Sequence, residues 1–194
     1  MNFLAHMALS SPDPDEMLGN LLGDFAKYLD IPTLPPAIQR GIRLHRQIDR
    51  FTDFHIVHLT SQQRISDERG RFAGVLIDVF YDHYLARDFP RWHACDLASF
   101  VLRAYSAVQT RLPILPHPVP TILRRMIEQD WLSCYAHLDG IDLTLQRIAT
   151  RLSRPTSLAS GIAELRANYA AFDSDFATFY PALVAHVKNT HLSS

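Results

Sequence analysis

Residues 41–53 read Gly41-Ile42-Arg43-Leu44-His45-Arg46-Gln47-Ile48-Asp49-Arg50-Phe51-Thr52-Asp53. Apolar side chains recur in this stretch at mostly helical spacing, and its only strong helix breaker is the glycine at its start. His45, Asp49 and Asp53 are each four residues apart, so on a helix they form one ladder with about one turn per step. An imidazole and two carboxylates on one helical face can bind a hard divalent cation, although the same spacing also fits a solvated face with surface ion pairs.

Length and composition indicate one globular domain spanning residues 1–194. Of the 194 residues, 47% are hydrophobic and 20% are charged, which suits a packed core and argues against disorder. The formal net charge of -1 gives no overall attraction to nucleic acid or to anionic lipid, so neither is expected as a partner.

Cysteine content and the N-terminal sequence predict the compartment. The two cysteines form no CxxC motif, which fits a reducing compartment and excludes a cysteine-based zinc site. The first residues lack the basic start and long apolar run of a signal peptide, and no stretch of about 18 apolar residues could cross a membrane. We therefore expect a cytoplasmic protein.

The apolar pattern predicts helix after helix, separated by proline-rich joints, with no convincing pair of strands. A first helix is expected to open at the capping residue Asp13 and at Pro14. The other expected helices cover about residues 37–64, 71–86, 96–111, 119–137, a short segment ending near 152, and 158–186, in which Pro181 is expected to introduce a kink or a new segment. The predicted fold class is all-α, a single-domain helical bundle.

Polar side chains in apolar surroundings mark candidate site residues on other predicted helices. Asp78, for example, lies between Ile77 and Val79, and a carboxylate there is costly to bury unless it is paired or bound to a metal. A buried ion pair or a helix cap explains one such residue equally well, but His or Asp residues in apolar context on four predicted helices favour one shared site. The candidates are His6, Asp24, His45, Asp49, Asp78 and Asp82, with His83 beside them.

This mixture of ligands indicates a chemistry. Imidazole and carboxylate groups without cysteine suit Mn2+, Mg2+ or Fe2+ better than structural zinc. A site of this kind can activate water and neutralise phosphate charge, which are the two requirements of phosphoester hydrolysis. Arg46 is a candidate to hold a phosphate bidentately, and an ordinary surface ion pair is the alternative.

Several long motifs resemble the acyl carrier protein phosphodiesterase family, a divergent relative of the HD-domain metal phosphohydrolases. They are Met1-Asn2-Phe3-Leu4-Ala5-His6, Gly19-Asn20-Leu21-Leu22-Gly23-Asp24-Phe25, the residues of 41–53, Asp78-x-x-x-Asp82-His83-x-Leu85-Ala86, Asp130-Trp131-Leu132 and Asp175-Phe176-x-x-Phe179-Tyr180-Pro181. The resemblance covers nearly the whole chain. It implies an HD-domain-like helical fold and a manganese-dependent hydrolase that removes 4'-phosphopantetheine from holo-acyl carrier protein.

The resemblance also implies roles for the candidates. His6 and His45 are the expected imidazole ligands, and Asp24, Asp49 and Asp78 are the expected carboxylate ligands or the base. The expected catalytic set is Asp24, His45, Arg46, Asp49, Asp82 and His83. His83 is a candidate to protonate the leaving oxygen, with a hydrogen-bonded core histidine as the alternative. The chain has no adjacent His-Asp pair, only His45-Arg46 and the reversed Asp82-His83, so its ligand set differs from that of ordinary HD enzymes.

An acidic acyl carrier protein is the partner that the resemblance implies. A partner enzyme needs a basic rim even when its net charge is near zero. The expected carrier-binding residues are Arg40, Arg43, Arg50 and Arg64. A charged face that serves only solubility is the alternative reading of each.

Two other functions fit the sequence. One is an HD-like phosphohydrolase that acts on a nucleotide or another small phosphoester. The other is a helical module that binds carrier proteins without chemistry, although a docking surface alone needs none of the buried-looking His and Asp residues.

Overall fold

A computed structural model describes residues 1–152 and 156–192, and within these ranges the protein is all-α and contains no strand. The α-helices are α1 (Phe3–Ala8), α2 (Pro14–Leu22), α3 (Pro36–Phe54), α4 (Ile56–Gln63), α5 (Ala73–Arg87), α6 (Phe89–Trp92), α7 (Leu97–Arg111), α8 (Val119–Glu128), α9 (Trp131–Cys134), α10 (Leu138–Ala149), α11 (Ile162–Ala167) and α12 (Tyr169–Leu192). Short 3-10 helices are η1 (Gly23–Tyr28), η2 (Ile31–Thr33), η3 (Asp67–Phe72), η4 (Leu112–Ile114) and η5 (Ser157–Ser160). The all-α prediction is confirmed.

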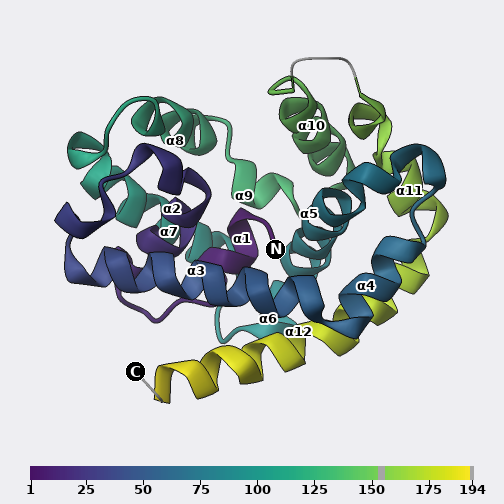
Figure 1. Ribbon diagram of the computed structural model, residues 1–194, viewed down its shortest axis with the longest axis horizontal. Coiled ribbons are helices and arrows are strands. Elements are labelled where there is room, and N and C mark those ends of the chain that lie inside the picture. Colours follow the sequence, from purple (N-terminus) through teal and green to yellow (C-terminus); the bar gives the residue numbers. More distant parts are fainter. Residues whose placement is uncertain (153–155, 193–194) are drawn as a thin grey trace.

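Helix α1 lies at the centre of the molecule, and longer helices surround it (Figure 1). Helices α2, α7 and α8 lie to one side of it, helices α5, α10 and α11 lie to the other, and α3 and α12 run across both groups. Helix α1 packs against both α2 and α5. Its Leu4, Ala5 and Met7 are completely buried, so the start of the chain is part of the core.

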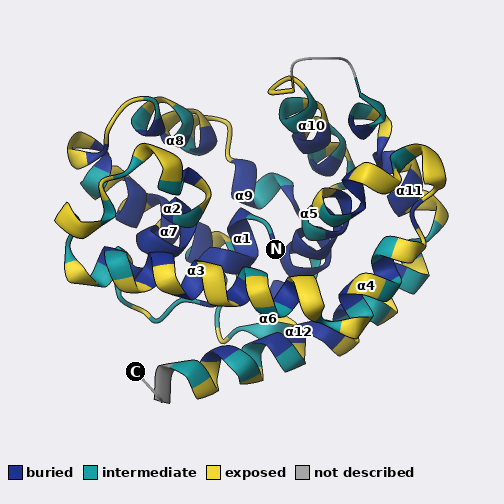
Figure 2. Cartoon of the chain, in the orientation of Figure 1, coloured by how far each residue is buried: buried dark blue, intermediate teal, exposed yellow. Residues whose placement is uncertain are grey.

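Burial follows the sequence pattern of each helix (Figure 2). Helix α5 is apolar on nearly all sides and is buried along most of its length, as expected for a helix with neighbours all around. Helix α3 instead buries one face, which includes Ile42, Leu44 and Ile48, and exposes its arginines on the other. None of the helices in the described ranges has the combined length and apolar character of a membrane span.

Two predicted helix starts are confirmed by capping contacts. The Asp13 side chain accepts a hydrogen bond from the Asp15 backbone N–H at 2.9 Å, and Pro14 occupies the first turn of α2. Asp96 caps α7 in the same way by accepting from the Ser99 backbone N–H at 2.7 Å.

The predicted continuous helix over residues 37–64 was wrong, because the chain breaks at His55. His55 has extended backbone angles (φ -76°, ψ 126°), and its Nδ1 atom accepts a hydrogen bond from the Val57 backbone N–H at 3.3 Å. Histidine is not among the usual capping residues, which are Ser, Thr, Asp and Asn, so this helix start had no ordinary sequence signal. The break turns α4 against α5 and α12.

Two later helix boundaries also differ from the prediction. The expected helix over residues 119–137 is interrupted at Asp130, which has a left-handed backbone (φ 44°) and whose Oδ1 accepts from the Tyr105 hydroxyl at 2.9 Å. In the expected stretch 158–186 the break falls at Asn168, where α11 ends, while α12 continues through Pro181. A single proline in a long helix flanked by buried aromatic residues is therefore tolerated here, because packing offsets its cost.

The contact between α2 and α3 depends on a glycine. A Cβ atom at Gly41 would lie 2.1 Å from the Glu16 carbonyl oxygen and 2.5 Å from the Asn20 backbone nitrogen. These are backbone atoms, so they cannot move aside without separating the two helices. Gly41 thus fixes the distance between α2 and α3.

We expect Gly41→Ala to lower the free energy of unfolding by about 1–3 kcal/mol, the usual cost of forcing an extra carbon into a packed contact. Urea unfolding followed by circular dichroism measures this loss. Gly70→Ala is the matched control, because a Cβ atom at Gly70 meets no atom within 4 Å. Equal stability of the two variants would contradict the close-packing account.

Candidate metal centre and adjoining pocket

Three side chains from two helices converge on one point beside the buried α1. The His6 Nε2 atom, on α1, lies 3.1 Å from Asp49 Oδ1, and the His45 Nε2 atom lies 3.0 Å from Asp49 Oδ2. His45 and Asp49 are one turn apart on α3, as the ladder in the sequence predicts. The two imidazole rings stack with their centroids 3.9 Å apart. Asp53, the third member of the ladder, is exposed and is not part of this group.

Asn20, on α2, fixes the tautomer of both imidazoles. Its Nδ2 atom donates to the His6 carbonyl oxygen at 2.6 Å and to Ser10 Oγ at 3.0 Å, which orients its Oδ1 atom towards His6 Nδ1 at 2.9 Å. The Asn20 carbonyl oxygen lies 2.8 Å from His45 Nδ1. Both oxygens can only accept, so each Nδ1 must carry a hydrogen. A neutral ring protonated at Nδ1 leaves its Nε2 lone pair free.

Two imidazole lone pairs therefore face the two oxygens of one carboxylate. All four atoms are hydrogen-bond acceptors, so the arrangement requires a cation among them, either a proton or a metal ion. The buried His6 Nε2 atom has no partner with hydrogen-bond geometry among the described residues. One ligand atom from each of His6, His45 and Asp49 can be chosen so that all lie within 4.8 Å of one another. This donor set, with its outer shell supplied by Asn20, fits a divalent metal ion.

Electrostatics within the group favour a charged carboxylate. Burial acts to raise the pKa of Asp49, but the contacts with His45 and His6 outweigh it and hold the pKa well below its usual range. Burial lowers the pKa of His6, with its contact to Asp49 acting in the opposite direction. For His45 the burial effect is outweighed by Asp49, and the pKa is raised.

The local sequence explains how His45 reaches this position. A Cβ atom at Gly23 would lie 2.1 Å from His45 Cγ, so the His45 ring occupies the space that a side chain at residue 23 would fill. Gly23 begins η1, directly after the helix that carries Asn20. The Gly19–Phe25 motif therefore supplies both the tautomer-fixing oxygens and the room for the ring.

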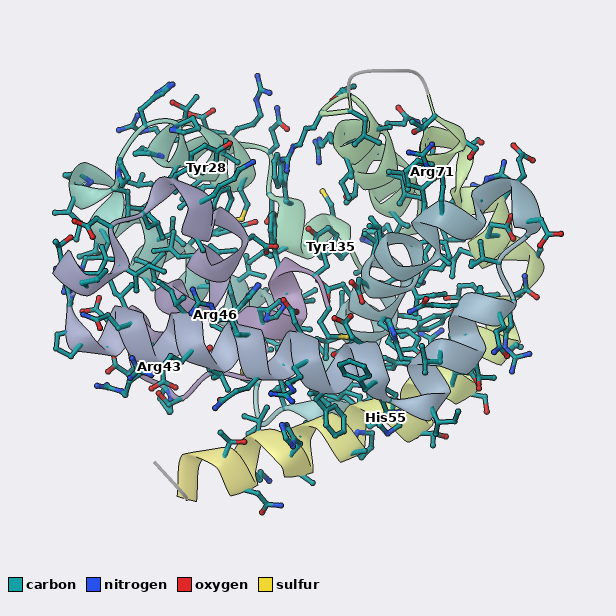
Figure 3. All side chains as sticks on the ribbon, viewed as in Figure 1. Tyr28, Arg43, Arg46, His55, Arg71 and Tyr135 are labelled. Atoms are coloured by element: carbon teal, nitrogen blue, oxygen red, sulfur yellow. The ribbon has the colours of Figure 1, made fainter. Side chains whose placement is uncertain are left out.

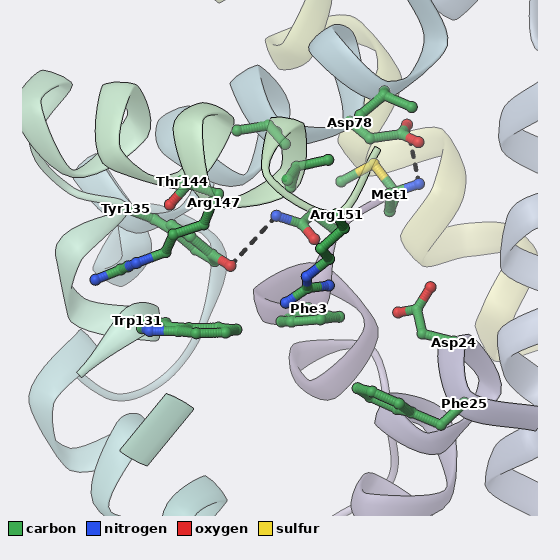
Figure 4. Close-up of a pocket in the computed structure, with 14 residues that line it drawn as sticks. Met1, Phe3, Asp24, Phe25, Asp78, Trp131, Tyr135, Thr144, Arg147 and Arg151 are labelled. Atoms are coloured by element: carbon green, nitrogen blue, oxygen red, sulfur yellow. Dashed lines mark hydrogen bonds and ion pairs between the residues drawn. The ribbon is translucent and has the colours of Figure 1, made fainter. Parts of the chain in front are cut away.

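A pocket of about 270 Å³ (Figure 4) lies beside the group, because its lining includes Met1, whose amino nitrogen is 4.0 Å from Asp49 Oδ1. Its walls include the two carboxylates Asp24 and Asp78, which the sequence analysis assigned to the same site. Reduced hydration in this concave setting raises the pKa of Asp24, and the nearby His45 and His6 act in the opposite direction. Asp24 is exposed to solvent through the pocket and lies outside the three-residue group.

Asp78 has other partners. Its Oδ1 atom lies 3.0 Å from the Met1 amino nitrogen and 3.1 Å from His58 Nε2. Burial acts to raise the pKa of Asp78, but the amino group and His58 outweigh it and lower the pKa. The Met1 nitrogen is also 4.0 Å from Asp49 Oδ1, so the amino group links Asp78 to the candidate metal-binding group, His6, His45 and Asp49.

Asp82 and His83, both predicted to be catalytic, do not line the pocket. Asp82 is completely buried and accepts hydrogen bonds from the backbone N–H groups of Leu4 (2.8 Å) and Ala5 (3.2 Å), so it caps α1. His83 is buried between the Tyr135 carbonyl oxygen and the Tyr169 hydroxyl, each 2.8 Å from one ring nitrogen. The contacts of His83 fit the alternative of a hydrogen-bonded core histidine. The contacts of Asp82 stabilise the start of α1.

None of the predicted arginines lines the pocket, and Figure 3 shows Arg43 and Arg46 along α3. Arg43, Arg46 and Arg50 are exposed on α3 and form no ion pair with residues in the described ranges. Arg40 is 3.3 Å from Asp13, and Arg64 is 3.0 Å from Asp175, so these two already have acidic partners.

Sequence reasoning missed several residues of the site. Asn20 stood out as a polar residue among Leu and Gly, but its shared contact with two histidines depends on tertiary packing. The pairing of His58 with Asp78 was missed for the same reason, because it requires the break at His55. Arg147 and Arg151, which line the pocket, carried no sequence signal beyond ordinary helical spacing.

Comparison with known proteins gives a consistent family. A family model described as acyl carrier protein phosphodiesterase matches residues 1–183. Proteins of that name are similar over full length. That of Serratia proteamaculans (strain 568) is 32% identical over 193 residues, that of Yersinia pestis is 31% identical over 193 residues, and that of Escherichia coli O157:H7 is 33% identical over 199 residues; each alignment covers 99% of this chain and 100% of the relative. No solved structure matches the chain, so the likeness to HD-domain enzymes stays a prediction.

Burial of Asp82 predicts a pH dependence of stability. Burial raises the pKa of Asp82 from 3.8 to about 7, with the backbone N–H groups acting in the opposite direction. The folded protein therefore keeps this proton across a range in which the unfolded chain has released it, and raising the pH through that range favours unfolding. Asp82→Asn cannot titrate, so its stability relative to wild type should rise with pH by about 1.4 kcal/mol per unit between pH 5 and pH 7.

Urea unfolding of both proteins at pH 5, 6 and 7 measures this difference. Because all other groups are shared, the difference isolates residue 82. A stability difference that stays constant with pH would show that Asp82 is already ionised at pH 5 in the folded protein.

Proposed function

The chain belongs to the acyl carrier protein phosphodiesterase family, and from this premise we propose that it hydrolyses the phosphodiester between holo-acyl carrier protein and its 4'-phosphopantetheine arm. The products are apo-acyl carrier protein with a free serine hydroxyl and 4'-phosphopantetheine. The observation that carries the proposal is that the His6–His45–Asp49 group lies beside a pocket lined by two further carboxylates, Asp24 and Asp78.

We assign Mn2+ to that group, with Mg2+ or Fe2+ as substitutes. The Nε2 atoms of His6 and His45 and the Asp49 carboxylate would hold the ion, and Asn20 would keep both imidazoles in the required tautomer. The bound ion supplies Lewis acidity and neutralises charge on the phosphoryl oxygens. Asp49, which the two imidazoles keep ionised, matches the need for an anionic ligand.

Asp24 is the residue that we propose to handle the proton. It lies on the pocket wall outside the three-residue group, and its raised pKa brings it closer to that of an effective base at neutral pH. In the reaction a water oxygen bonds to phosphorus, and the bond from phosphorus to the serine oxygen breaks. The Asp24 carboxylate accepts the proton that the water loses, and the leaving serine oxygen takes a proton from solvent to become a hydroxyl.

The exposed face of α3 is our candidate for binding the acidic carrier protein. Arg43 and Arg50 have no internal acidic partner in the described ranges, so they are available to an external one. Beyond Arg50, at the joint between α3 and α4, Phe54 is 79% exposed and Ile56 is 72% exposed. Basic residues beside exposed apolar ones suit a partner that offers both acidic and apolar groups.

Variants of Asp49 and Asp24 separate metal binding from proton transfer. Asp49→Asn should weaken Mn2+ binding by more than about 100-fold, since even an outer-shell partner contributes about 10–100-fold. Asp24→Asn should keep Mn2+ binding while its rate of hydrolysis falls by about 10²–10⁴-fold, the usual contribution of a general base. Mn2+ titration calorimetry and intact-mass analysis of holo-acyl carrier protein measure the two effects.

Asp53→Asn is the matched control, since Asp53 is exposed one turn beyond Asp49 and should retain both properties. Coenzyme A and free nucleotides serve as alternative substrates. Loss of Mn2+ binding in Asp24→Asn would make Asp24 a ligand instead, and cleavage of nucleotides in preference to the carrier protein would reject the proposed substrate.

Charge reversal on α3 tests the proposed docking of the carrier protein. Arg43→Glu and Arg50→Glu should raise the KM for holo-acyl carrier protein much more than they lower kcat, because they act on encounter and not on the reacting atoms. Turnover should also weaken with rising salt, since ions screen exposed charges beyond about 8–10 Å. Arg166→Glu, an equal charge change on α11, is the control. Salt-independent kinetics would contradict a basic docking face.

A further inference from the structure

Aromatic rings form one side of the pocket beside the metal-binding group. Phe3 and Trp131 stack with an interplanar angle of 6° and centroids 6.3 Å apart, and Phe25 continues the surface with its centroid 6.2 Å from that of Phe3. All three residues line the pocket. They come from α1, α9 and η1, so the surface exists only in the folded chain (Figure 4). A flat apolar surface of this kind suits a slender, mainly uncharged chain.

Two arginines lie over this aromatic surface, Arg147 on α10 and Arg151 just after the end of that helix. The Arg147 Cζ atom is 5.1 Å from the Trp131 ring centroid, and the Arg151 Cζ atom is 5.8 Å from it. Both guanidinium groups face the same Trp131 ring, although Arg151 follows the last residue of α10, Ala149. Neither forms an ion pair with a residue in the described ranges. The contacts with Trp131 hold the two cations in place without neutralising them.

The Arg147 Nη1 atom is buried and has no hydrogen-bond partner among the described residues. A buried guanidinium donor without an acceptor is costly, and an anionic oxygen is the partner that relieves this cost best. The acidic residues of the pocket, Asp24 and Asp78, belong to other elements, and Asp78 already contacts Met1 and His58. The arginine side of the pocket therefore lacks an acceptor that a ligand can supply.

We propose that Arg147 and Arg151 form the phosphate-binding subsite of this pocket, and that Phe3 and Trp131 support the pantetheine chain attached to that phosphate. This inference rests on the proposed function, and it specifies where the substrate arm binds. A phosphodiester has two unbridged oxygens, so one can face the metal-binding group while the other accepts from a guanidinium. The pocket volume of about 270 Å³ is slightly below the range of small-molecule sites, which begins at about 300 Å³.

The sequence analysis proposed Arg46 as the phosphate-binding residue, and the subsite assigns that role to Arg147 and Arg151 instead. Arg46 is exposed on α3 and does not line the pocket. Arg147 lines the pocket and has an Nη1 donor without a partner among the described residues, as a phosphate-binding residue requires. In this proposal Arg147 and Arg151 bind phosphoryl oxygens whose bonds to phosphorus stay intact, so they orient the phosphate without taking part in bond cleavage.

Calorimetric titration of the Mn2+-loaded protein with 4'-phosphopantetheine, pantetheine and inorganic phosphate tests the subsite. Wild type should bind 4'-phosphopantetheine at least about tenfold more tightly than pantetheine, and Arg147→Gln and Arg151→Gln should each lose about tenfold in affinity for the phosphorylated ligand, as expected when a charge-assisted contact is removed. Their affinity for pantetheine should be unchanged. Arg166→Gln is the charge-matched control and should bind all three ligands like wild type.

A fluorescence titration locates the ligand. The chain has two tryptophans, so in a Trp92→Phe background the emission reports on Trp131 alone, and it should change on binding of 4'-phosphopantetheine. Melting curves verify that the arginine variants fold, and the exposed Arg151 provides the second variant if Arg147→Gln is destabilised.

The inference is overturned if pantetheine binds as tightly as 4'-phosphopantetheine, if both arginine variants retain wild-type affinity, or if Trp131 emission does not respond. These readouts use free ligand and no carrier protein. A protein that shows the arginine-dependent binding but leaves holo-acyl carrier protein intact would contradict the proposed reaction and not the subsite, and the converse result would contradict the subsite alone.

Discussion

The hydrogen bonds of Asn20 to His6 and His45 are the interactions on which the site depends. One residue uses its side-chain oxygen for one imidazole and its backbone oxygen for the other, so both rings expose an Nε2 lone pair in the same direction. This works only while α2 stays close to α3, and Gly41 permits that distance. The helix packing and the ligand geometry are thus one constraint, because a shift of α2 would rotate both imidazoles away from Asp49.

The short, buried helix α1 carries His6, one of the three residues of the candidate metal-binding group. Helices of six residues are not stable alone, so α1 depends on partners for its unpaired N–H groups. Asp82 supplies them from the centre of α5, in a place where burial raises the pKa of its carboxyl group. The molecule therefore accepts a costly buried acid in order to hold His6 at the metal-binding group. Asp82 thus holds α1, the helix that carries His6, and does not itself line the pocket.

The sequence predicted those features that arise within one helix and missed those that arise between helices. The all-α class and the adjacency of His45 and Asp49 follow from periodicity alone, and the structure contains both. Periodicity cannot tell which polar residue caps a distant helix, so Asp82 and His83 were grouped with the site, although their neighbours are backbone atoms and a tyrosine. The orientation of Arg147 was equally out of reach, because it depends on where Trp131 lies after the left-handed turn at Asp130.

Anomalous diffraction from crystals of the protein grown with Mn2+ tests the central claim most directly. The account predicts a manganese peak within bonding distance of the Nε2 atoms of His6 and His45 and of an Asp49 oxygen, with both Nδ1 atoms still hydrogen-bonded to Asn20. A peak at another set of residues, or no peak at saturating Mn2+ with the two imidazoles bonded to Asp49 through protons, would contradict it.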